Sequence, residues 1–109
     1  MSIQRSDVID GIGLEHADEK VVMLISDHLA WDDPTHVPLL ATKIEAYTSA
    51  TLSGQLADSY PQAAGKSTII RLIYEKLPDA AALRFLSTIK DQLQLAGIAF
   101  EHLPLPSNY

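Results

Sequence analysis

Two short, dense apolar runs constrain the fold of this chain more strongly than any other feature of its sequence. The first, VVMLIS at residues 21–26, consists almost entirely of β-branched and aliphatic side chains. The second, at residues 66–76, is nearly as dense and is interrupted by Arg71. The first run is typical of a strand that is buried on both faces, and the second is dense enough for a central strand. We therefore expect both runs to lie in the interior of one sheet.

Weaker patterns predict the remaining elements. Residues 8–15 predict a first strand, weakened by two glycines, and the polar segment HADEK joins it to residues 20–26 as a hairpin. Apolar side chains recur at three- and four-residue steps in residues 35–53, and a similar stripe follows Asp79, which predicts two amphipathic helices. Residues 98–103 predict a last strand. Residues 55–65 show no clear periodicity and predict an irregular connection.

Turn and capping residues predict where the two helices begin and end. Thr35 is a candidate N-cap of the first helix, which places Pro38 in the first turn, where a missing N–H breaks no bond. Gly54 predicts the end of that helix as a left-handed residue. Asp79 is a candidate N-cap of the second helix, and Gly97 predicts its end.

The element order is therefore ββαβαβ, which predicts the α+β fold class. The economical architecture is a two-layer sandwich, in which a mixed four-stranded sheet carries two helices on one face. At 109 residues the chain has the length of one domain with its own core. We expect a single domain over residues 1–109, with an ordered core at about residues 8–103 and a tail at 104–109.

Charge and composition restrict the classes of partner. The net charge is −6, and the basic residues are scattered singly along the chain, so nucleic acid and anionic membranes are disfavoured as partners. A basic protein partner fits this charge. The absence of cysteine excludes thiolate zinc sites and thiol nucleophiles. Neither a signal-peptide pattern nor a membrane-spanning apolar run is present, which predicts a cytoplasmic protein.

Several short strings follow one another in an order that resembles a known family. They are VID at 8–10, ISDHLAWDD at 25–33, LLATKIEAY at 39–47, SGQL at 53–56 and YPQAAGK at 60–66. The sequence resembles a family of small bacterial single-domain proteins of unknown function. The resemblance implies a bacterial origin and a single-domain organisation, and it implies no activity, cofactor or partner.

One apparent nucleotide-binding motif fails on its spacing. AAGKST at 63–68 ends like a phosphate-binding loop, but Tyr60 occupies the position of the first glycine that this loop requires. The residues that follow predict a strand, whereas the loop needs a helix N-terminus against the phosphates. We predict no cofactor for this chain.

The stretch ISDHLAWDDPTH at residues 25–36 holds the candidate functional cluster: Asp27, His28, Trp31, Asp32 and Asp33. A metal site could combine these carboxylates with His28 and His36, or with the distant His16 and His102, but the spacing matches no established ligand pattern.

The structural interpretation explains more of these residues. Asp27 ends a strand, and Trp31 anchors the chain under the helix. Asp32 and Asp33 lie just before the helix, where the helix dipole stabilises negative charge. In this interpretation His28 pairs with a carboxylate. We therefore assign no catalytic, cofactor-binding or metal-binding residues.

Two functional classes remain after these arguments. The favoured one is a non-catalytic protein-interaction module, an accessory or immunity-type factor that binds a basic protein. The alternative is a small metal-dependent enzyme or ligand-binding protein that uses Asp27, His28, Asp32 and Asp33. Nothing in the sequence assembles a nucleophile, a base and an orienting group, so an enzyme is the less favoured class. The sequence leaves homodimer formation open.

Overall fold

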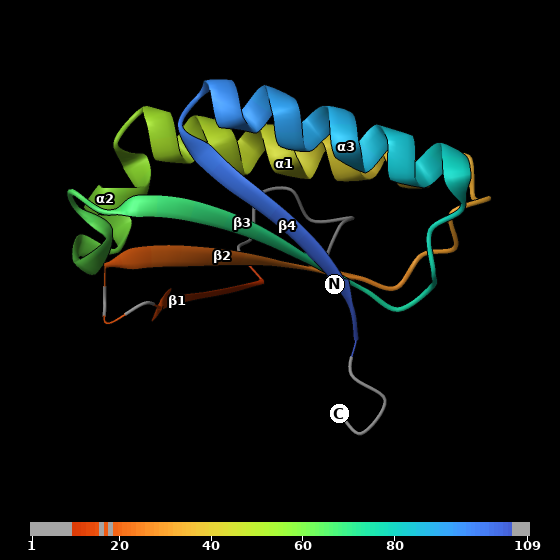
Figure 1. Cartoon of the computed structure of the whole chain (residues 1–109). Coiled ribbons are helices and arrows are strands. Elements are labelled where there is room, and N and C mark those ends of the chain that lie inside the picture. Colours follow the sequence, from red (N-terminus) through yellow and green to blue (C-terminus); the bar gives the residue numbers. More distant parts are fainter. Residues whose placement is uncertain (1–9, 16, 18, 106–109) are drawn as a thin grey trace.

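A computed structural model describes residues 10–15, 17 and 19–105 of the chain. Its strands form one four-stranded sheet, and the two long helices lie together on one face of it (Figure 1). The strands are β1 (Gly11–Glu15), β2 (Lys20–Asp27), β3 (Ser67–Tyr74) and β4 (Ile98–Pro104). The helical elements are α1 (His36–Leu52), α2 (Gln55–Ser59), the 3₁₀ turn η2 (Pro61–Ala63) and α3 (Ala80–Leu95).

The strands lie in the order β1-β2-β3-β4. Strand β1 is antiparallel to β2, whereas β2, β3 and β4 are mutually parallel. Both connections between parallel strands step in the same direction across the sheet. The strong right-handed preference of such crossovers accounts for α1 and α3 lying on one face. The predicted α+β class, the mixed four-stranded sheet and the placement of the two long helices are confirmed.

The core lies between the sheet and the helix layer. Alternate side chains of the two central strands point toward the helices, as the period of two requires. These side chains and their helical partners are buried: Val21, Met23, Ile25, Ile70 and Leu72 from the strands, with Leu40, Ile44 and Leu86 from the helices. Burying each such aliphatic side chain stabilises a fold by about 1.5–3 kcal/mol.

The opposite face, which we call the open face, is covered by neither α1 nor α3 (Figure 1). By strand alternation and pairing, its side chains include Val22, Leu24, Ile69, Arg71, Ile73, Glu101 and Leu103. Val22 and Ile69 are buried, whereas Leu24, Ile73 and Leu103 are only half-buried. The expectation that β2 is buried on both faces is therefore wrong for the half of this strand that lies near its carboxyl end.

The segment between α1 and β3 differs from the prediction. Residues 55–65 were expected to be irregular, but they contain α2 and η2. Both elements are shorter than the window over which helical periodicity can be detected. Each still contributes to the core, through Leu56 and Ala63. Gly54 has a φ of 85°, so it ends α1 in the left-handed conformation as predicted.

The predicted boundaries of the terminal elements can be compared only in part. Residues 8 and 9 of the expected first strand lie outside the described residues, and so do residues 106–109 of the expected tail. Strand β4 includes Pro104, which was expected to belong to the tail. Within the described part of the chain, no helix has the length and apolar character needed to cross a bilayer.

Candidate functional site

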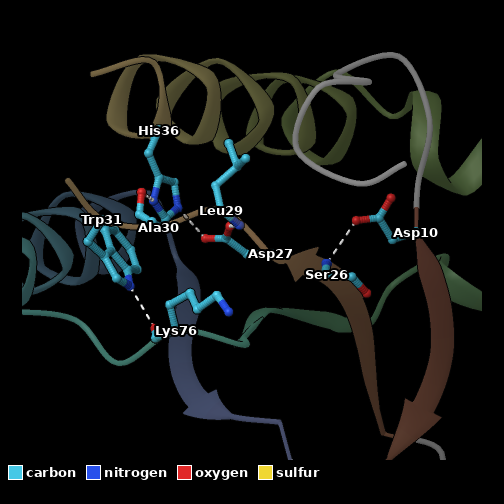
Figure 2. Close-up of polar contacts among 8 residues, drawn as sticks. All are labelled: Asp10, Ser26, Asp27, Leu29, Ala30, Trp31, His36 and Lys76. Atoms are coloured by element: carbon cyan, nitrogen blue, oxygen red, sulfur yellow. Dashed lines mark hydrogen bonds and ion pairs between the residues drawn. The ribbon is translucent and has the colours of Figure 1, made fainter. Parts of the chain in front are cut away.

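The stretch at residues 25–36 lies where the parallel strands end. Asp27 is the last residue of β2 and pairs with Tyr74 of β3. Its carbonyl oxygen accepts a hydrogen bond from the Glu75 N–H at 2.8 Å, so the two strand ends are tied together. The loop that follows leads to His36, the first residue of α1 (Figure 2).

The centre of this region is a buried pair between Asp27 and His36. Asp27 Oδ2 lies 2.5 Å from His36 Nε2, and both side chains are inaccessible to solvent. Asp27 Oδ1 accepts the Leu29 N–H at 3.1 Å, and His36 Nδ1 lies 3.0 Å from the Ala30 carbonyl oxygen (Figure 2). A carbonyl oxygen only accepts, so Nδ1 donates its proton to Ala30, and Nε2 faces the Asp27 carboxyl group.

These bonds determine what the pair can do chemically. Both ring nitrogens of His36 are occupied by partners inside the fold, and both carboxylate oxygens of Asp27 accept hydrogen bonds there. A histidine that acts as a general base or as a metal ligand needs one nitrogen directed at its target. The Asp27–His36 pair therefore fits a structural role, in which it joins the end of β2 to the start of α1.

Trp31 is half-buried and packs against this pair. Its ring stacks on the His36 imidazole with centroids 4.0 Å apart and planes 29° apart. Its Nε1–H donates to the Lys76 carbonyl oxygen at 2.8 Å, which links the loop to the segment after β3 (Figure 2). The geometry agrees with the expected role of Trp31 as an anchor.

The other members of the predicted cluster lie apart from this pair. Asp33 Oδ1 accepts hydrogen bonds from the Thr35 N–H at 2.9 Å and the Thr35 hydroxyl at 2.7 Å, and these bonds lower the pKa of Asp33. Thr35 is the N-cap of α1, but its side chain makes no capping bond. Asp32 and His28 are exposed. The imidazole that pairs with Asp27 is that of His36, whereas the sequence had suggested His28.

No three His, Asp or Glu side chains of the described chain lie close enough together to hold a metal ion. His16, one of the distant ligands considered, lies outside the described residues. His102 is half-buried on β4, with its ring 6.0 Å from that of Tyr74 and 6.3 Å from that of Phe100. Burial lowers the pKa of His102, and the charge of Lys90 adds to this effect.

A second buried polar network was not predicted. Lys43 of α1 is fully buried, and its Nζ lies 2.7 Å from Asp10 Oδ1. The other oxygen of Asp10 accepts the Ser26 N–H at 2.8 Å. The Tyr47 hydroxyl donates to the Leu24 carbonyl oxygen at 2.7 Å and accepts the Asp10 N–H at 3.0 Å. Burial raises the pKa of Tyr47 to about 12.

One sequence signal could have revealed this network. Lys43 lies three residues after Leu40 and four before Tyr47, so it falls within the apolar stripe of its helix. A charged side chain at such a position needs a buried partner. The sequence alone does not identify Asp10 as that partner, because the two residues are brought together only by the packing of α1 on the hairpin.

The open face is held together by Arg71 of β3. Its guanidinium donates to Glu15 of β1 at 2.6 and 2.9 Å, and its Nε donates to Glu101 of β4 at 2.6 Å. Arg71 therefore connects the two edge strands through its own central strand. The hydrogen bonds that Arg71 donates to Glu15, followed by its interactions with Glu101, raise the pKa of Arg71 above its ordinary value.

A depression of about 440 Å³ lies at the carboxyl end of the strands, beside the Asp27–His36 pair. Its lining residues are Ser26, Asp27, His28, Ile73, Glu75 and Leu105. The depression includes His28, as the sequence suggested, but Trp31 does not line it. Ser26, His28 and Glu75 are all exposed.

Comparison with known proteins places the chain in a family. Residues 1–105 match the family of unknown function DUF6572. The chain belongs to this family. Neither a curated protein nor a solved structure shows significant similarity to the chain. Membership in DUF6572 agrees with the resemblance to a family of unknown function and assigns no activity, so any function must be argued from the geometry described above.

Proposed function

We propose that this chain is a non-catalytic protein-interaction module, an accessory or immunity-type factor that acts by occupying a basic partner protein. The observation that supports this proposal most is the internal pairing of Asp27 and His36. Asp27, one of the residues that suggested chemistry in the sequence, bonds within the fold, with both of its carboxylate oxygens and both His36 nitrogens engaged. The surface beside them is an open depression with apolar side chains.

The net charge supports a basic partner. At a net charge of −6, the chain attracts positively charged proteins over a distance of about 10 Å at 0.1 M salt, and this attraction accelerates association. A partner of the same sign would be repelled. This argument favours a basic protein over an acidic one and over a second copy of this chain.

The alternative, a metal-dependent enzyme or ligand-binding protein, has less support. It requires Asp27, His28, Asp32 and Asp33 to converge, but the Asp27 carboxylate is buried against His36, and Asp33 bonds Thr35 at the helix entry. Elemental analysis of the purified chain provides a direct check. A metal bound at one equivalent, and lost in His28→Ala, would favour the alternative.

Affinity capture from the host that naturally makes this chain tests the proposal. The tagged chain should retain a basic protein at about 0.1 M salt and release most of it near 1 M salt, where charges are screened within about 3 Å. Mass spectrometry would identify the retained protein and its charge. A chain that remains alone at low salt would contradict the proposed function.

A further inference from the structure

We infer that the partner docks on the open face, over the depression at the carboxyl ends of β2, β3 and β4, and that it inserts an apolar side chain flanked by basic residues. This inference rests on the proposed function and identifies its surface. The apolar floor of the depression consists of Ile73 and Leu105, and Leu103 pairs with Ile73 on the neighbouring strand. These three residues lie on strands β3 and β4 or directly after them.

The register brings the apolar floor together. Ile73 pairs with Leu103 on one side and with Ser26 on the other, so these side chains share one face. Leu105 lines the same depression as Ile73 and is 41% exposed. Its N–H donates to the Tyr74 carbonyl oxygen at 2.8 Å, which fixes its backbone beside β3. The floor is therefore preformed, which reduces the entropy lost on binding.

The volume of the depression sets the size of the anchor. At about 440 Å³, it lies within the range of small-molecule and side-chain pockets, which begins near 300 Å³. A leucine-sized side chain fits with part of its flanking backbone. Apolar side chains on such a floor remain partly exposed until a partner covers them, so their burial contributes to the affinity together with the charges.

The rim of the depression carries acidic groups. Glu75 lines it with a side chain that is 51% exposed, and the Glu101 side chain on the same face is 46% exposed. The positive charge of Arg71 is balanced by two carboxylates, those of Glu15 and Glu101, which leaves an excess of negative charge on the face. Lys76 Nζ lies 4.0 Å from Glu75 Oε1, and its positive charge offsets the negative charge of that carboxylate only in part.

This charge distribution selects the occupant. Lysine or arginine residues beside an apolar anchor would complement Glu75 and Glu101. A second copy of the chain would instead place the same carboxylates opposite one another. Two molecules that each carry a net charge of −6 would also repel each other. A second depression of about 420 Å³, beside Ile98 and Phe100, is lined by Lys90 and would repel basic residues. The open face is therefore the better match.

Amide chemical shifts of the full ¹⁵N-labelled chain test the inference with synthetic peptides. The first probe has a central leucine flanked by lysines, the second has glutamates in place of the lysines, and the third has alanine in place of the leucine. The lysine–leucine peptide should shift the amides of Ile73, Glu75, Leu103 and Leu105. It should bind at least about tenfold more tightly than either of the other peptides.

Matched variants separate the apolar and electrostatic contributions. Leu105→Gln should lower the affinity for the lysine–leucine peptide about tenfold. Leu83→Gln, which changes an exposed leucine on α3, should leave this affinity unchanged. Glu75→Gln should weaken binding about threefold and Glu45→Gln on α1 should not. None of these four substitutions removes a buried side chain, so the fold should persist, as circular dichroism can verify.

Several results would overturn the assignment of this surface. They are shifts that map to α1 or α3, equal binding of the lysine and glutamate peptides, and a Leu105→Gln variant that behaves like Leu83→Gln. The absence of binding at millimolar peptide would also overturn it. In each case the capture of a basic host protein by the chain would still support the proposed function, so failure of the surface and failure of the function are distinguishable.

Discussion

At the scale of single residues, burial decides between a chemical and a structural role for the same side chains. Asp27 and His36 would be candidates for acid–base chemistry if either presented a free polar atom to solvent. Their polar atoms instead bond to one another, to Leu29 and to Ala30. The sequence indicated that the acidic stretch contains a strand end and a helix entry, but it did not indicate that His36 is the partner of Asp27.

Because Asp27 is paired with His36, we expect its substitution to lower the free energy of unfolding far more than substitution of the nearby Asp32. Asp27→Ala removes the partner of a buried imidazole and should lower the free energy of unfolding by about 3–5 kcal/mol. Asp32→Ala, at an exposed position in the same loop, should change it by less than about 0.5 kcal/mol. Urea denaturation followed by circular dichroism measures both. Equal effects of the two substitutions would contradict a structural role for the pair.

Tyr47 predicts a specific loss of stability at alkaline pH. Its pKa rises from 10.0 to about 12 on folding, because burial disfavours the phenolate. The folded state therefore retains a proton that the unfolded state releases, so the contribution of this group is complete below pH 10 and falls as the pH rises toward 12.

Comparison with Tyr47→Phe isolates this contribution, because the variant lacks the titrating hydroxyl. Denaturation between about pH 9 and 12 should show a steeper loss of stability in the unmodified chain than in Tyr47→Phe. Parallel pH profiles would show that the Tyr47 hydroxyl does not titrate differently in the folded and unfolded states.

At the scale of elements, local capping residues define the helix ends. Asp79 was predicted as the N-cap of α3, and its Oδ1 accepts the Ala82 N–H at 2.8 Å. The backbone of Asp79 is extended, as an N-cap requires. Thr35 occupies the corresponding position in α1 but bonds Asp33 with its hydroxyl, so the two helices begin in different ways.

The N-cap of α3 supports a quantitative prediction. Asp79→Ala should destabilise the chain by about 1 kcal/mol, because the Ala82 N–H loses its acceptor. Asp91→Ala, at an exposed position within the same helix, removes an equal charge without removing a cap. Thermal unfolding of the two variants measures the difference. A melting temperature for Asp79→Ala equal to that of Asp91→Ala would contradict the assignment of the cap.

The sequence predicted the elements that carry dense or periodic apolar patterns, and it missed those whose formation depends on tertiary contacts. The two apolar runs predicted β2 and β3 to within two residues of their observed ends. Helix α2 has only five residues, too few to show a period. The Lys43–Asp10 pair joins residues 33 positions apart, and no local pattern encodes a pairing at that distance.

At the scale of the whole molecule, the two faces of the sheet have different roles. The helix-covered face contains the core and both buried polar networks, whereas the open face combines the Arg71 cross-link with the half-exposed apolar floor. The polar residues that attract attention in the sequence therefore stabilise one side of the molecule. The residues proposed to bind the partner lie on the other side, and no sequence motif marks them.

The central claim is that this chain binds a basic protein through its open face. Quantitative affinity capture from the natural host, with the unmodified chain, Leu105→Gln and Leu83→Gln compared in parallel, tests this claim most directly. The account predicts that the unmodified chain and Leu83→Gln retain the same basic protein, and that Leu105→Gln retains about a tenth as much. Equal recovery by all three chains, or recovery of no basic protein by any of them, would contradict it.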